Sequence, residues 1–96
     1  MNKISDIKAV INSNRAVLED NYNIKKLSVF GSFARGEQTK NSDIDMLVEF
    51  KSPVGFGFFR ASRYLEEILG RKVDLVTKDA LRPELKKNIV RELINV

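Results

Sequence analysis

Asp43 and Asp45, two aspartates separated by one residue, are the side chains of this chain with the clearest chemical potential. They lie in an apolar, β-branched segment, so we predict a strand over Ser42 to Phe50. Side chains alternate between the faces of a strand, which places both carboxylates on one face and the apolar side chains on the other. Two carboxylates about 4 Å apart repel by roughly 4 kcal/mol at an effective dielectric near 20, and this favours a bound cation between them.

The residue types available indicate which cation this is. Carboxylate oxygens select hard ions such as Mg²⁺ or Mn²⁺, and the chain contains no histidine and no cysteine to form a zinc site. A third aspartate, Asp74, lies in a second predicted strand at 72–77 and would complete a two-metal site if the two strands are neighbours. The sequence leaves that neighbourhood open, and the simpler alternative is that these acids are solvated surface.

A predicted phosphate-binding turn precedes the acidic strand. Gly31 and Ser32 follow an apolar run, Leu27 to Phe30, and a strand that breaks into a helical turn leaves backbone N–H groups facing outward. Gly31 lets the backbone approach a ligand, Ser32 adds a hydroxyl, and Arg35 supplies a planar fork that matches phosphate oxygens. The segment is neither a Walker A loop nor GxGxxG. The alternative is that the glycine serves only the turn and that Arg35 is a solvated charge.

The sequence resembles the DNA polymerase β type nucleotidyltransferase superfamily in four segments, namely Gly31-Ser32, Arg35-Gly36, Ser42-Asp43-Ile44-Asp45 and Val73-Asp74-Leu75. It is most similar to the minimal nucleotidyltransferases, the MNT group, whose members often act as antitoxins beside HEPN-domain partners. The resemblance implies an α+β fold in which a mixed β-sheet is flanked by helices. It also implies a single nucleotidyltransferase domain over residues 1–96.

By this resemblance, the three aspartates are the catalytic and metal-binding residues. Asp43 and Asp45 would ligate two Mg²⁺ ions that hold a nucleoside triphosphate, with Mn²⁺ as the alternative ion. Asp74 would bind the catalytic ion and help to deprotonate an acceptor hydroxyl. The implied reaction transfers a nucleotidyl group to that hydroxyl, with ATP as the expected donor and the donor base left open.

The resemblance also implies which residues bind the nucleotide. Ser32 and Arg35 would hold the β- and γ-phosphates. Gly31 and Ser42 would be the small residues that let the triphosphate lie against the backbone. For Ser42, a role as a strand-start or cap residue is the structural alternative.

Larger relatives carry an extra helical domain that holds the acceptor, and this chain stops at Val96 without one. We therefore expect another chain to present the acceptor, and we predict an antitoxin that adenylylates a HEPN-type toxin. One alternative is a non-catalytic antitoxin or nucleotide-binding module that acts by complex formation. A second is a small-molecule or RNA nucleotidyltransferase with a separate substrate-binding subunit.

Composition agrees with a small enzyme domain. The chain has 96 residues and a net charge of +4, and its excess of positive charge lies in residues 51–96, which hold ten Lys plus Arg and six Asp plus Glu. Basic residues do not alternate with aromatic ones, so we expect no direct nucleic-acid partner. With no disulfide, signal peptide or long apolar stretch, we expect a cytoplasmic protein without a membrane partner. The oligomeric state, including a homo-oligomer, stays open.

Three helices are predicted as the scaffold. Apolar residues recur at helical spacing from Ser5 to Asp20. A second helix is predicted to begin at Pro53 and to end at Gly70. The last is predicted to begin at Pro83 and to carry an apolar stripe as far as Val96.

Overall fold

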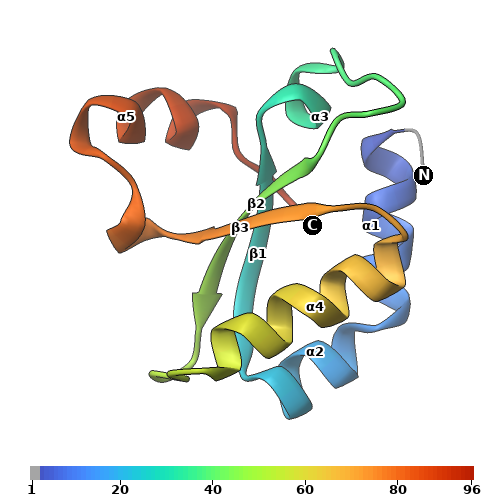
Figure 1. The fold of residues 1–96 in the computed structure, drawn as a ribbon, viewed down its shortest axis with the longest axis vertical. Coiled ribbons are helices and arrows are strands. Elements are labelled where there is room, and N and C mark those ends of the chain that lie inside the picture. Colours follow the sequence, from blue (N-terminus) through green and yellow to red (C-terminus); the bar gives the residue numbers. More distant parts are fainter. Residues whose placement is uncertain (1–2) are drawn as a thin grey trace.

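The computed structural model describes residues 3–96, which form a four-stranded mixed sheet with helices packed against it (Figure 1). The strand order is β3-β2-β1-β4, with β1 at Ile24–Phe30, β2 at Ile44–Phe50, β3 at Val73–Thr77 and β4 at Ile94–Asn95. β1 runs antiparallel to β2 and to β4, whereas β2 and β3 are parallel. The predicted α+β class with a mixed sheet is confirmed.

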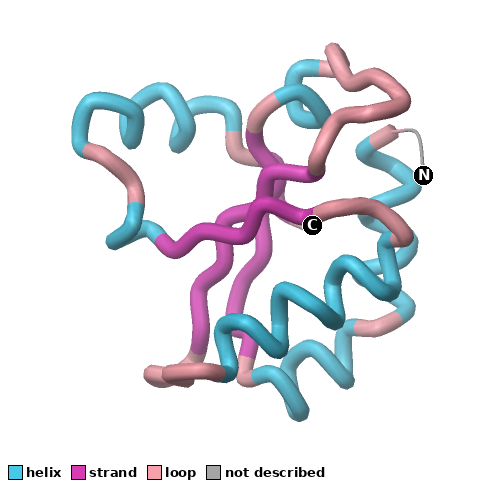
Figure 2. The backbone as a smooth tube through the Cα atoms, viewed as in Figure 1, coloured by secondary structure: helices cyan, strands magenta, loops and turns pink. Residues whose placement is uncertain are grey.

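Helices α1 (Ile4–Ser13), α2 (Arg15–Tyr22) and α4 (Gly57–Leu69) pack together on one side of the sheet, and α5 (Pro83–Glu92) lies on the opposite side (Figures 1 and 2). The short helix α3 (Ser32–Arg35) follows β1, and a 3₁₀ turn (Lys78–Ala80) follows β3. The three packed helices contribute to the core Ile7, Ile11, Leu18, Ala61, Leu65 and Leu69. One face of the sheet is therefore buried, and the other is left open for chemistry.

The acidic strand shows the alternation expected from its sequence. Ile44, Met46 and Val48 are buried in the core, so Asp45 projects from the open face. β2 begins at Ile44, two residues later than predicted, and Asp43 therefore immediately precedes the strand. The predicted boundary was wrong because ladder pairing with β3 starts only where the N–H of Ile44 bonds the carbonyl of residue 72.

The predicted helix over residues 5–20 is in fact two helices, α1 and α2, that meet at Asn14. Asn14 has φ −113° and ψ 12°, and its side-chain amide donates to the carbonyl of Val10 at 2.8 Å. The hydroxyl of Tyr64 on α4 donates to the Asn14 side chain at 3.0 Å. An asparagine side chain that bonds nearby backbone groups competes with the helix, which explains the break that apolar spacing alone could not reveal.

Two predicted boundaries of the later helices are confirmed, and one is wrong. Pro83 is the first residue of α5, and α4 ends before Gly70, which adopts a left-handed conformation with φ 65°. However, α4 begins at Gly57 rather than at Pro53. Gly55 interrupts the intervening segment with φ 55°, a conformation that a helix does not contain.

The last helix also ends earlier than its apolar stripe suggests. α5 ends at Glu92, and the following residues form β4, which pairs with β1. Asn95 and Ser28 bond through their side chains at 2.9 Å, and the N–H of Val96 donates to Leu27 at 3.1 Å. Pairing with the free edge of β1 satisfies backbone groups that the end of an isolated helix would leave exposed, so tertiary contact overrides the helical pattern here.

Within residues 3–96, no helix combines the length and the apolar character needed to cross a membrane.

Candidate active site

The strand register brings two of the three predicted carboxylates together. Asp45 on β2 lies directly opposite Asp74 on β3, in a parallel pair that the sequence left open. Residues paired in this way point to the same face of a sheet. Asp43 precedes β2 at the same end, so acidic side chains from two neighbouring strands gather on the open face.

Asp45 is the carboxylate whose pKa is raised by this arrangement. Its side chain is half-buried, whereas Asp43 and Asp74 are exposed. Burial is the largest cause that raises the pKa of Asp45 to about 6, followed by the charges of Asp74 and Asp43, while Arg35 partly offsets them. The carboxylates of the ligand-free site therefore repel one another when they are ionised, and a divalent cation bound among them would relieve this repulsion.

We predict that Asp45 makes the ligand-free protein less stable as the pH rises. Folding raises the pKa of Asp45 to about 6 from its ordinary value of 3.8. The folded state therefore binds the proton more tightly than the unfolded state, and the free energy of unfolding falls between about pH 4 and pH 6. Asp45→Asn removes this penalty. In thermal melts with a chelator present, the variant should exceed wild type in melting temperature by more at pH 7.5 than at pH 4. An equal difference at both pH values would contradict the assignment.

The donor set on the open face fits a hard divalent ion. Residues 3–96 hold no preformed cluster of three acidic side chains close enough to share an ion. The carboxylates are nevertheless neighbours, because the charges of both Asp43 and Asp74 raise the pKa of Asp45. Carboxylate oxygens are the ligands that Mg²⁺ and Mn²⁺ prefer, and a cation would relieve the repulsion among them. The residues therefore fit the ion that the sequence predicts.

The glycine of the predicted phosphate turn lies against Asp45. β1 ends at Phe30, which pairs with Asp45, and Gly31 follows with φ 74°. A Cβ atom at Gly31 would overlap a carboxylate oxygen of Asp45, so a side chain there would force the Asp45 carboxylate to move. Only glycine both accepts this conformation at low cost and leaves room for the carboxylate. The predicted turn and the predicted metal ligands thus form one site.

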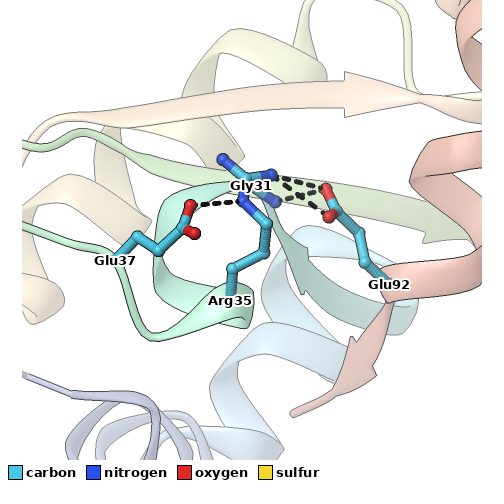
Figure 3. Close-up of polar contacts among 4 residues, drawn as sticks. All are labelled: Gly31, Arg35, Glu37 and Glu92. Carbon is cyan, nitrogen blue, oxygen red and sulfur yellow. Dashed lines mark hydrogen bonds and ion pairs between the residues drawn. The ribbon is translucent and has the colours of Figure 1, made fainter.

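Arg35, the predicted phosphate ligand, is held by two carboxylates (Figure 3). Its Nε donates to Glu37 at 2.8 Å, and its Nη1 donates to Glu92 at 3.1 Å. Hydrogen bonds to Glu37 and then to Glu92 are the main causes that raise the pKa of Arg35. Glu92 also accepts the N–H of Gly31 at 2.9 Å.

Sequence reasoning missed Glu92 because it treated the last helix only as scaffold. Glu92 is the final residue of α5. An acidic side chain in the last turn of a helix is disfavoured by the helix dipole, so a glutamate there indicates another partner. That signal was present in the sequence, but it did not identify Gly31 and Arg35 as the partners.

The two predicted serines occupy different places. Ser32 is the first residue of α3, and its carbonyl accepts the N–H of Glu37 at 2.8 Å. Ser42 lies before β2, where its hydroxyl accepts the N–H of Thr39 at 2.8 Å and its carbonyl accepts Arg71 at 3.0 Å. In this structure Ser42 thus organises the loop at 36–41. A role of either serine in binding nucleotide stays a prediction.

A groove of about 550 Å³ lies beyond the carboxylates along the sheet. Leu47 and Glu49 line it from β2, Ser28 lines it from β1, and Thr77 and Leu93 lie along its sides. Leu47 follows Asp45 by two residues, so it projects from the same face about 6.6 Å farther along the strand. The groove therefore begins beyond Asp45, on the side away from the Gly31 turn, and Asp43, Asp45 and Asp74 lie outside its lining.

The chain is similar to known proteins over nearly its whole length. Residues 11–96 match the nucleotidyltransferase domain family. A candidate protein adenylyltransferase of Methanocaldococcus jannaschii is 46% identical over 98 residues, which is 100% of both chains. A solved structure described as a candidate minimal nucleotidyltransferase matches with a TM-score of 0.75 and 33% identity, over 94% of this chain and 95% of that one.

A second solved structure, a toxin–antitoxin complex with AMP-PNP, matches with a TM-score of 0.70 and 27% identity, over 88% of this chain and 69% of that one. These similarities agree with the site built from the strand register and the Gly31 turn, and they confirm the resemblance seen in the sequence. The chain belongs to the nucleotidyltransferase domain family and is a nucleotidyltransferase of the minimal type.

Proposed function

We propose that this protein is a Mg²⁺-dependent adenylyltransferase that transfers AMP from ATP to a hydroxyl of a partner protein. The observation that carries the proposal is the register that sets Asp45 opposite Asp74, next to the Gly31 turn. A glycine turn with an arginine beside acidic residues from two strands suits a triphosphate and its metal ions, because the arginine pairs with phosphate oxygens and the carboxylates with the metal.

Asp43, Asp45 and Asp74 would hold the Mg²⁺ ions, with Mn²⁺ as a substitute. When bound, these ions supply positive charge that stabilises the triphosphate and the departing pyrophosphate. The Gly31 turn and Arg35 would orient the β- and γ-phosphates, so that the α-phosphorus lies over Asp45. Ser32 and Ser42 flank the same end of the sheet, in keeping with the contacts predicted for them.

The chemistry is a single displacement at the α-phosphorus. Asp74, exposed and at the edge strand, accepts the proton of the acceptor hydroxyl. The hydroxyl oxygen then forms a bond to the α-phosphorus, and the bond from that phosphorus to the oxygen of the β-phosphate breaks. The products are an AMP ester of the acceptor and pyrophosphate. No covalent intermediate with the enzyme is required.

The groove beyond Asp45 is the place that this geometry offers to the acceptor. Attacking and leaving oxygens lie roughly in line in phosphoryl transfer. Because pyrophosphate would leave toward the Gly31 turn, the hydroxyl approaches from the opposite side, where Leu47 and Ser28 line the groove. Its volume of about 550 Å³ accommodates a side chain with neighbouring residues of a protein segment.

A HEPN-type toxin is the partner that we propose for this reaction. The support is the resemblance to MNT antitoxins, together with the similarity to a structure described as a toxin–antitoxin complex with AMP-PNP. In that setting, modification of the toxin by AMP would neutralise it. We also propose that residues 1–96 act as a single nucleotidyltransferase domain and that the partner presents the acceptor.

Incubation with labelled nucleotides and candidate partners tests the proposal directly. We expect label from α-labelled ATP to appear on a HEPN-type protein only when Mg²⁺ or Mn²⁺ is present, and mass spectrometry should locate AMP on a hydroxyl side chain. Label on RNA or on a small molecule would support a different acceptor. Stable complex formation without label would favour the alternative of a non-catalytic antitoxin.

We also predict that nucleotide binding depends on metal and on Arg35. ATP with Mg²⁺ at about 100 times its dissociation constant should stabilise the fold by roughly 2.7 kcal/mol, and ATP with a chelator should do much less. Arg35→Ala should lose most of this stabilisation, measured relative to the same variant without ligand, because the guanidinium that would bind the phosphate oxygens is absent. Arg63→Ala, at an exposed arginine of α4, is the matched control and should keep it. Equal shifts with and without metal would indicate another mode of nucleotide binding.

A further inference from the structure

Glu92 joins the last helix to the phosphate-binding turn. Its Oε1 accepts the backbone N–H of Gly31 at 2.9 Å, across 61 residues of sequence. Arg35 Nη1 donates to the same carboxylate at 3.3 Å to Oε1 and 3.1 Å to Oε2. One side chain from α5 therefore holds both the backbone and the arginine that the proposed function assigns to the triphosphate (Figure 3).

Glu37 contacts the same arginine in a different way. It bonds only Nε of Arg35, at 2.8 Å, and it lies two residues farther along the same segment. The side chain of Glu37 is 65% exposed, whereas that of Glu92 is 25% exposed. Exposed ion pairs contribute little to stability, because water and salt screen them. Although the Glu37 bond to Arg35 is the shorter one, at 2.8 Å against 3.1 Å, the greater exposure of its carboxylate makes Glu37 the more readily displaced of the two.

The Gly31 contact explains why Glu92 should stay in place. Gly31 is buried, and a buried N–H group is costly unless it is paired. Its positive φ sets the direction in which the chain enters α3 beside Asp45. A carboxylate that holds this N–H and one end of the Arg35 guanidinium fixes both groups before a ligand arrives, and this lowers the ordering cost of binding.

Charge decides what happens when phosphate binds. Two carboxylates on one guanidinium give the group an excess of negative charge, and a phosphate must compete with one of them for Arg35. Glu37 has the single bond and the greater exposure, so it is the one that yields. We propose that Glu92 is a positioning residue that holds Gly31 and Arg35 for the triphosphate, and that Glu37 is displaced by it. This inference rests on the proposed function and assigns opposite roles to two glutamates on one arginine.

The matched pair Glu92→Gln and Glu37→Gln tests the inference, because each variant removes one negative charge next to Arg35. Dissociation constants are measured by calorimetry for MgATP and for magnesium tripolyphosphate, which lacks the nucleoside. We expect Glu37→Gln to bind both ligands about threefold more tightly than wild type, and Glu92→Gln to bind both about tenfold more weakly. Loss of charge alone would tighten binding in both variants, so opposite signs identify positioning.

A double-mutant cycle with Arg35→Ala provides the second readout. If Glu92 acts through Arg35, Glu92→Gln should weaken binding much less in the Arg35→Ala background than in wild type. Circular dichroism and melting temperature verify that each variant is folded. Glu92→Asp, which keeps the charge but shortens the reach, replaces Glu92→Gln if the latter does not fold, and it should also weaken binding.

Three results would overturn the inference. Binding to folded Glu92→Gln that equals or exceeds wild-type affinity would show that Glu92 does not position the turn. If Glu92→Gln and Glu37→Gln changed the affinity by the same amount, the loss of one negative charge would explain both effects. If the effects of Glu92→Gln and Arg35→Ala on binding were fully additive, Glu92 would not act through Arg35. Failure of the proposed function is distinguishable, since there the wild-type protein itself would neither bind MgATP nor transfer AMP.

Discussion

Asp43→Asn and Asp45→Asn are each expected to abolish nucleotidyl transfer while leaving the fold intact. Asp45 is half-buried and its pKa is raised to about 6 by burial and by its acidic neighbours, so a neutral side chain of the same shape removes repulsion from the ligand-free protein. The cost appears when metal and triphosphate must bind. Charge stabilisation by bound metal is worth several kcal/mol, so we expect a loss of about a thousandfold or more in rate.

The measurement is transfer of labelled AMP in Mg²⁺, with matched folding by circular dichroism. Asp20→Asn is the control, since this exposed aspartate lies on α2, on the covered side of the sheet. It undergoes the same chemical change and should transfer normally. Activity near the wild-type rate in either active-site variant would refute the assignment of the metal ligands.

The second large effect is expected at Asp74, where binding and chemistry should separate. Asp74 is exposed on the edge strand β3, opposite Asp45. If its main role is to accept the proton of the acceptor hydroxyl, Asp74→Asn should still bind MgATP but should lose transfer by about 10²- to 10⁴-fold. Calorimetry with MgATP and a transfer assay on the same sample make this comparison.

Co-expression with the toxic partner extends the Asp74 prediction to cells. An enzyme that neutralises by modification should leave the partner unmodified by mass spectrometry and the cells poisoned when it carries Asp74→Asn. A stoichiometric binder would protect them regardless. Rescue by this variant at wild-type expression levels would therefore favour the non-catalytic alternative over adenylylation.

Local rules of sequence were sufficient for much of the site. An alternating strand places Asp45 opposite its buried neighbours Ile44 and Met46, and the break at Gly31 ends β1 where it was predicted to end. These features depend on residues close together in the chain. The alternation of side chains along a strand determines the first, and the backbone conformations open to glycine determine the second. The family and the α+β class followed from the same short segments.

Local rules failed where a distant segment offered a better partner. The predicted first helix breaks at Asn14, which bonds Tyr64 of α4, and the predicted last helix gives way to β4 because β1 has an edge to pair with. Neither competing contact is visible in the periodicity of the segment itself. At Asn14 a local bond to the Val10 carbonyl acts together with the bond from Tyr64 against the helix, and at β4 strand pairing alone overrides helical propensity.

The sequence by itself determined which residues can do chemistry, namely three aspartates, a glycine turn and an arginine, because side-chain type and spacing fix donor chemistry. Only the tertiary structure decided that Asp74 lies opposite Asp45, and that Glu92 reaches Gly31 and Arg35. Strand order, register and the return of the chain through α5 depend on how apolar faces pack across the whole domain. No window of neighbouring residues contains that information.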